Sequence, residues 1–110
     1  MGEVFNTNQL EWIPIRPDIA SGVFGKTLLA DDIKLVLTRV IAGGRFNMHR
    51  DKYGHLFYFL SGEGLVWVED KQLKIKPGLV VQITAGKLHA YENTGNQNLM
   101  LISVNLAVRQ

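Results

Sequence analysis

Hydrophobic residues along the chain gather in short runs, which glycine, proline, asparagine, aspartate and serine separate. No stretch of ten or more residues shows a clean helical period. The runs are rich in valine, isoleucine, leucine and aromatic residues, a composition typical of β-strands. The pattern therefore predicts an all-β sandwich or barrel, with at most a short helical turn. The expected strands cover residues 23–29, 33–41, 55–60, 65–69, 72–76, 79–83, 88–92 and 98–108.

The first part of the chain, residues 1–22, is expected to be an N-terminal lead-in with a short edge strand over residues 12–15. Pro14 favours an edge position because proline has no N–H group to donate to a neighbouring strand. A chain of 110 residues has room for one compact domain, which we expect to cover residues 1–110.

Two local signals predict where strands end. Gly43 and Gly44 are expected to break the strand over residues 33–41, because consecutive glycines weaken a strand. Residues 70–71 are expected to form the two-residue turn of a β-hairpin.

The composition excludes several classes of function. The net charge is only +2 and the basic residues are scattered, whereas a nucleic-acid-binding protein usually carries a larger basic stripe. The absence of cysteine excludes disulfides, thiolate metal sites and thiol nucleophiles. Near the N-terminus no basic segment precedes an apolar one, and no apolar run approaches the roughly 18 residues that span a bilayer. We therefore expect a cytoplasmic protein that binds neither nucleic acid nor membranes.

All three histidines of the chain belong to a predicted metal site, with Asp51 as a fourth ligand. His49 and Asp51 are two residues apart, so on an extended segment their side chains point to the same face. His55 opens one apolar strand and His89 begins a later one. Alternate residues line the interior of a barrel, so ligands from separate strands can converge there. Histidine and carboxylate are ligands that first-row divalent metals take.

Two segments of the chain resemble the two conserved motifs of the cupins. The first motif runs from a glycine through His-x-His and a glutamate to a second glycine; the residues at these positions, with the same spacing, are Gly43, His49, Asp51, His55 and Gly62. The second motif contains Gly, Pro-x-Gly, His and Asn; its positions are held by Gly78, Thr84, Gly86, His89 and Asn93. The resemblance implies a jelly-roll β-barrel with a metal at its centre.

The chain departs from the cupin pattern at three positions. Asp51 stands where the family usually has its second histidine, and His55 where it usually has glutamate. The set of three histidines and one carboxylate is therefore kept, while the carboxylate moves along the chain. Because aspartate is short, Asp51 has an alternative role, in which it orients a ligating histidine without binding the metal. Thr84 replaces the proline of the second motif, and we interpret this as a tolerated change in a bend.

Iron, manganese, nickel, zinc and copper are all compatible with these ligands, because imidazole suits most of them and no thiolate biases the choice. Three nitrogen ligands disfavour calcium and magnesium. His49, Asp51 and His89 also form the HxD…H pattern of the facial triad of non-haem iron oxygenases, which leaves positions open for oxygen and substrate. His55 would fill one more position, and no 2-oxoglutarate clamp is evident.

Alternation along the strands places further residues on the same face as the ligands. Arg45 shares parity with His49 and is a candidate for binding an anionic substrate, although a surface arginine at the mouth fits as well, because the glycine-rich approach can disturb parity. Tyr91 shares parity with His89 and is a candidate proton donor, although a packed core tyrosine fits the pattern as well. Phe57 is expected in the barrel core.

These observations leave three hypotheses on function. The first is a small metal-dependent enzyme, dioxygenase- or isomerase-like, that acts on a small molecule. The second is a non-catalytic cupin that binds a small ligand or stores a metal, and the third is a partner domain with a vestigial site. The resemblance also implies a homodimer, for which residues 12–15 and the final strand are candidate contact surfaces.

Overall fold

The computed structural model describes residues 3–106, which contain nine strands and one 3₁₀ turn. These elements are η1 (Thr7–Gln9), β1 (Ile13–Pro14), β2 (Ala20–Ala30), β3 (Lys34–His49), β4 (His55–Ser61), β5 (Gly64–Val68), β6 (Lys71–Ile75), β7 (Val80–Ile83), β8 (His89–Asn93) and β9 (Leu99–Asn105). All strand pairs within this part of the chain are antiparallel. The predicted all-β jelly-roll is therefore confirmed.

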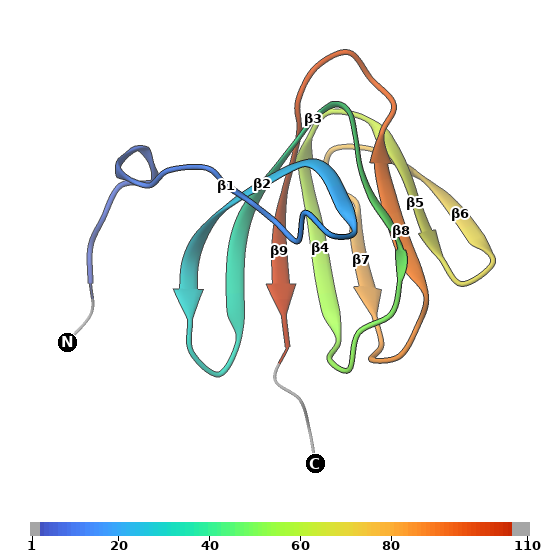
Figure 1. The fold of residues 1–110 in the computed structure, drawn as a ribbon, viewed down its shortest axis with the longest axis horizontal. Helices are drawn as coiled ribbons and strands as arrows, with labels where there is room; N and C mark the ends of the chain where they lie inside the picture. The colour runs from blue at the N-terminus through green and yellow to red at the C-terminus, as the bar shows by residue number, and fades with distance from the viewer. Residues whose placement is uncertain (1–2, 107–110) are drawn as a thin grey trace.

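The strands form one sheet that curls on itself (Figure 1). The hydrogen-bonded order is β6-β5-β8-β3-β9-β4-β7, with β2 also paired to β3 and β1 at the edge of β2. The first half of β3 pairs with β9, and its end pairs with β8. β3 therefore joins the two walls of the barrel, and the residues at its end lie beside β8.

The glycine pair does not end a strand, so that prediction was wrong: β3 continues through Gly43 and Gly44 to His49. The glycines lie where the partner of β3 changes from β9, which pairs up to Val40, to β8. A Cβ atom on Gly44 would lie 2.8 Å from the carbonyl oxygen of Gly22, so glycine lets β2 and β3 stay paired at this point.

Two other boundaries differ from the prediction. The β5–β6 hairpin turns at Glu69 and Asp70, one residue earlier than expected, and Glu69 takes a left-handed φ of 54°. Tight hairpin turns require positive φ, and nothing in the residue type of Glu69 indicated that it would supply one. β9 ends at Asn105, within the predicted final strand, whose last two residues, 107 and 108, lie outside the described part of the chain.

The core lies inside the curl, and in β4 it follows the alternation of the strand. In β4 the inward side chains, His55, Phe57 and Phe59, are buried, whereas Tyr58 and Leu60 between and beyond them are exposed. Burying an aromatic side chain contributes roughly 2–3 kcal/mol, so alternation of this kind fixes which face of each strand turns inward. The predicted core position of Phe57 is therefore confirmed.

Asn93, the last residue of the second motif, has a structural role at the end of β8. Its Nδ2 donates to the carbonyl oxygens of Val40 and Gln97, and its Oδ1 accepts from the N–H of Gly95. The side chain is 1% exposed, so these bonds hold the β8–β9 turn against β3 in a water-free environment. None of the helical residues described forms a segment long and apolar enough to cross a membrane.

Candidate metal centre

A β-bulge at the end of β3 aims His49 into the barrel. Phe46 pairs with Tyr91 of β8, and His49 pairs with His89, so three steps on β3 match two on β8. The extra residue reverses the alternation, so Phe46 and His49 both face inward and their rings stack with centroids 4.7 Å apart. The end of β3 thus places His49 directly beside His89.

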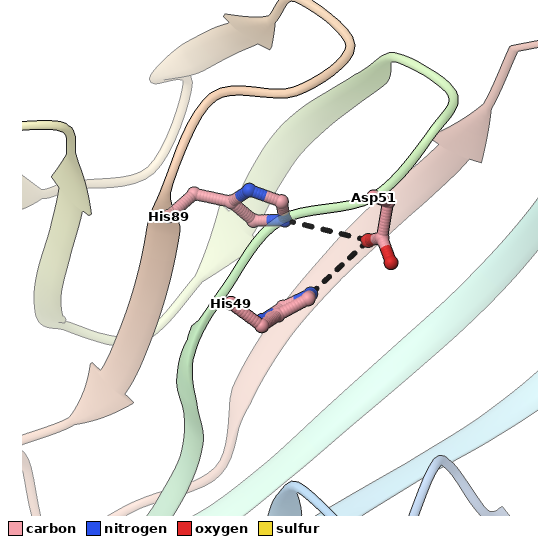
Figure 2. Close-up of side chains that lie close together, drawn as sticks. All are labelled: His49, Asp51 and His89. Atoms are coloured by element: carbon pink, nitrogen blue, oxygen red, sulfur yellow. Dashed lines mark hydrogen bonds and ion pairs between the residues drawn. The ribbon is translucent and has the colours of Figure 1, made fainter.

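The side chains of the three histidines converge on one carboxylate oxygen. The Nε2 atoms of His49, His55 and His89 lie 3.1, 2.8 and 3.8 Å from Oδ2 of Asp51. Figure 2 shows His49 of β3 and His89 of β8 pointing toward Asp51, which lies in the loop after β3. One donor atom from each of His49, Asp51 and His89 lies within 4.8 Å of the others. His55 reaches the same oxygen from β4 but does not belong to this mutually close group of three.

The far nitrogen of each ring has a partner that sets the tautomer. Nδ1 of His49 lies 2.7 Å from the carbonyl oxygen of Asn47, and Nδ1 of His89 lies 2.9 Å from that of Lys87. Nδ1 of His55 lies 3.0 Å from Oδ1 of Asn105. A carbonyl oxygen only accepts, so Nδ1 carries a proton in each ring, and a metal ion at the cluster would bind the lone pair that Nε2 of a neutral ring presents.

The second oxygen of the carboxylate binds an arginine that the sequence analysis did not identify. Nη1 of Arg16 donates to Oδ1 of Asp51 over 2.9 Å, which leaves Oδ2 for the histidines. Burial alone would raise the pKa of Asp51, but the hydrogen bonds from Arg16 and His55 outweigh it and hold that pKa below its usual value. The hydrogen bond to Asp51 in turn raises the pKa of Arg16. Arg16 and Asp51 are 35 positions apart, and the segment between them carries no periodicity that would have indicated this contact.

The donor set fits a metal ion. Burial lowers the pKa of His89 to about 4, so its ring is neutral at pH 7, and its buried Nε2 has no hydrogen-bond partner among the described residues. A lone pair that faces a carboxylate across 3.8 Å is stabilised by a cation between them. Two ligands that bind one metal at about 2.1 Å lie about 3.0–3.4 Å apart, and the Nε2 atoms of His55, His49 and His89 lie 2.8, 3.1 and 3.8 Å from Oδ2 of Asp51. The cluster can therefore hold a metal ion.

A cavity of about 550 Å³ opens beside the cluster. All four clustered side chains line it, and its aromatic wall consists of Phe46, Phe57 and Tyr91. Tyr91 is 3% exposed, and burial raises its pKa above the usual range, so its phenol stays protonated at neutral pH. The expected position of Tyr91 on the face of His89 is confirmed, and the ring packs against Phe57 with centroids 5.4 Å apart.

Of the two positions considered for Arg45, the structure shows the surface one. Arg45 is exposed and does not line the cavity, whereas its neighbour Phe46 is buried and does. The parity argument counted from His49 without the bulge, and one extra residue between Phe46 and His49 moves Arg45 to the outer face.

Comparison with known proteins gives one curated relative, an oxalate-binding protein from Thermotoga maritima. It is 39% identical over 49 residues, which are 44% of this chain and 40% of that protein. The match thus spans less than half of the relative's length. The structure of a predicted oxalate decarboxylase from Thermotoga maritima is similar with a TM-score of 0.83 and 25% identity, over 96% of this chain and 99% of that one.

The polyketide cyclase RemF from Streptomyces resistomycificus is similar with a TM-score of 0.86 over 96% of this chain and 79% of that one. At 20% identity this likeness shows the fold alone. The family model of the cupin domain matches residues 36–105, which include all four clustered residues and most of the strands. The chain belongs to the cupin family.

Proposed function

We propose that this chain holds one divalent transition metal with His49, His55, His89 and Asp51. The convergence of three Nε2 atoms on one carboxylate oxygen carries this proposal, because the Nε2 of His89 has no other partner in the described structure. Iron, manganese, nickel, zinc and copper all suit three imidazoles and a carboxylate. When bound, such a metal supplies a Lewis acid or a redox centre next to the cavity.

We propose further that the cavity binds a small-molecule substrate and that the protein is a metal-dependent enzyme of the dioxygenase or isomerase type. The aromatic side chains of the cavity pack on the histidines, with the ring centroids of Phe46 and His49 4.7 Å apart, and give this side of the cavity an apolar lining. The protonated phenol of Tyr91 supplies a hydrogen-bond donor inside the barrel. The cavity volume of about 550 Å³ suits a small molecule.

A non-catalytic function, binding of a small ligand at the metal, is the second candidate. It is favoured by the curated relative, which is named for binding oxalate and matches 44% of this chain. Turnover separates the two candidates: an enzyme converts its ligand under multiple-turnover conditions, whereas a binding protein returns it unchanged.

The metal proposal is tested by elemental analysis of protein purified without added metal, followed by calorimetric titration of metal into chelator-treated protein. About one equivalent of a first-row metal is expected. His89→Ala removes a ligand from one wall and is expected to weaken binding strongly. Asp70→Ala is a control for the loss of a carboxylate, since Asp70 is exposed in the β5–β6 turn. A wild-type protein that binds no metal in either measurement would contradict the proposal.

We also propose a homodimer that buries the outer face of β3, β9, β4 and β7. Leu37, Ile102, Tyr58 and Val80 lie in register across these four strands, and Tyr58 and Val80 are 43% and 50% exposed. A row of apolar side chains on an outer sheet face is typical of an interaction surface. Trp12 is engaged within its own chain, because Lys26 and Arg39 lie over its ring.

Analytical ultracentrifugation tests the dimer. The wild type is expected to sediment at twice the formula mass at micromolar concentration, and Tyr58→Lys to sediment as a monomer. Leu73→Lys is the control, because Leu73 is exposed to a similar extent on β6, outside the proposed interface. A monomeric wild type, or an equal effect of both substitutions, would contradict the proposed interface.

A further inference from the structure

The backbone around Arg16 holds its side chain at the mouth of the cavity. Arg16 has a left-handed φ of 40°, which costs energy in a non-glycine residue and needs support from its surroundings. That support comes from the N–H groups of Ile19 and Ala20, which both donate to the carbonyl oxygen of Arg16. Ile15, one residue earlier, donates to the carbonyl oxygen of Val23. A strained residue fixed on both sides and directed at the cluster points to a functional role.

The guanidinium of Arg16 is only partly used. It carries five N–H donors, and one nitrogen, Nη1, binds Oδ1 of Asp51. The side chain lines the cavity and is 41% exposed, so the protein covers only part of the guanidinium. Tyr53 lines the cavity nearby. Burial and the charge of Asp51 raise the pKa of its phenol, and Arg16 partly offsets this rise through its charge and a hydrogen bond with the phenol. The remaining donors are therefore available to a ligand, in the planar arrangement that suits a carboxylate.

The charge of the cavity favours the same class of ligand. Its lining contains three cationic side chains, Arg16, Lys26 and Lys34, and two carboxylates, Glu11 and Asp51. With neutral histidines these charges sum to +1, and a divalent metal raises the sum to +3. A cavity with low-dielectric aromatic walls concentrates this positive potential and attracts anions.

We infer that the ligand of this site is a small carboxylic acid in its anionic form, and that Arg16 binds its carboxylate while another of its oxygens lies at the metal. Only the carboxylate of Asp51 separates the Arg16 guanidinium from the histidine nitrogens, so an acid of two to four carbon atoms spans the two positions. Arg16 is then a specificity-determining residue, which selects charged ligands over neutral molecules of equal shape. This inference rests on the proposed metal site.

Calorimetric titration of metal-loaded protein tests the inference with oxalate, pyruvate and succinate as probes, and with oxamide as the neutral match of oxalate. At least one of the acids is expected to bind the wild type, and oxamide is not. Arg16→Gln is expected to weaken binding of the acid about 10- to 100-fold, the loss typical of a charge-assisted hydrogen-bond pair. Arg16→Lys keeps the positive charge but not the planar guanidinium, so its affinity for the acid should lie between those of the wild type and Arg16→Gln. Arg45→Gln removes the same charge from the outer face and should leave the affinity for the acid unchanged.

Metal is titrated into each variant first, so that the two proposals are judged separately. If the wild type binds metal but none of the three acids, the ligand class is wrong. If Arg16→Gln binds the acid as tightly as the wild type does, Arg16 is no anion anchor. If Arg16→Gln loses the metal itself, Arg16 acts by holding Asp51, and the inference is overturned. A wild type that binds no metal overturns both proposals.

Discussion

Acid should destabilise the metal-free protein through His89. The ring is buried, and burial lowers its pKa from 6.5 to about 4. The unfolded chain therefore binds a proton on this residue at a pH where the folded protein does not. Between pH 6.5 and about 4 the unfolded state holds more protons, so the free energy of unfolding falls as the pH falls, and the loss is complete below about pH 4.

The size of the effect follows from the size of the pKa shift. A shift of about 2.5 units corresponds to about 3 kcal/mol at 1.36 kcal/mol per unit. His89 is 2% exposed, so screening by solvent does not reduce this figure much. In a domain of this size, about 3 kcal/mol lowers the melting temperature by about 10–25 °C. Asp51 adds to the loss at lower pH, because its pKa is below 3.8.

The measurement is urea denaturation of chelator-treated protein at pH 7, 6, 5 and 4. His89→Gln is the matched control, since its amide has hydrogen-bonding groups but does not titrate. The carboxylates of the protein contribute equally to the pH dependence of unfolding in the wild type and in His89→Gln. The wild type should therefore lose about 3 kcal/mol more than His89→Gln between pH 7 and pH 4.

Equal losses in the two proteins would refute this reasoning. They would mean that His89 is protonated in the folded state near pH 6.5, because its Nε2 is open to water or becomes so through a structural change. NMR tests this independently, because the histidine signals of the folded protein report the titration of His89 directly. A resonance of His89 that titrates near pH 4 supports the explanation from burial.

Three further predictions concern the cluster and the barrel. Asp51→Ala should weaken metal binding about 100-fold or more in a competition assay with a chromophoric chelator, whereas a loss below about tenfold would make Asp51 an outer partner of the histidines. Asp51→His combined with His55→Glu restores the usual cupin order, so the double variant should bind metal more tightly than either single one. Gly64→Ala should cost at least about 2 kcal/mol in urea denaturation, because its Cβ would meet the carbonyl oxygen of Glu92; unchanged stability would contradict the packing of β5 on β8.

The parts of the site that the sequence predicted are those that regular alternation controls. In β4 and β8 every second residue points inward, so Phe57 follows His55 and Tyr91 follows His89 into the barrel. These strands are short and regular from the histidine onward, and burial of aromatic side chains fixes their register. The positions of the histidines in the two motifs, together with the predicted barrel, were therefore enough to predict that His49 lies beside the first residues of these two strands.

The parts that the sequence did not predict depend on irregular backbone and on distant contacts. The bulge before His49 arises from the pairing of β3 with β8, and pairing between strands 40 residues apart leaves no periodic signal. The continuation of β3 through Gly43 depends on the close approach of Gly22 to Gly44. Arg16 reaches Asp51 from a strained turn outside both motifs, and a local reading of residues 16–22 indicates only a turn.

The exchange of carboxylate and histidine along the first motif has a structural explanation. The N–H of Gly86 donates to the carbonyl oxygen of Asp51 over 2.8 Å, which ties the loop after β3 to the turn before β8. This bond places the backbone of Asp51 so near the cluster that a short side chain is long enough. His55 begins β4, and its ring reaches from there to both Oδ1 of Asn105, through Nδ1, and Oδ2 of Asp51, through Nε2. Both positions therefore reach the same point of the barrel. This explains how three histidines and one carboxylate converge although Asp51 and His55 exchange the residue types of the usual cupin order.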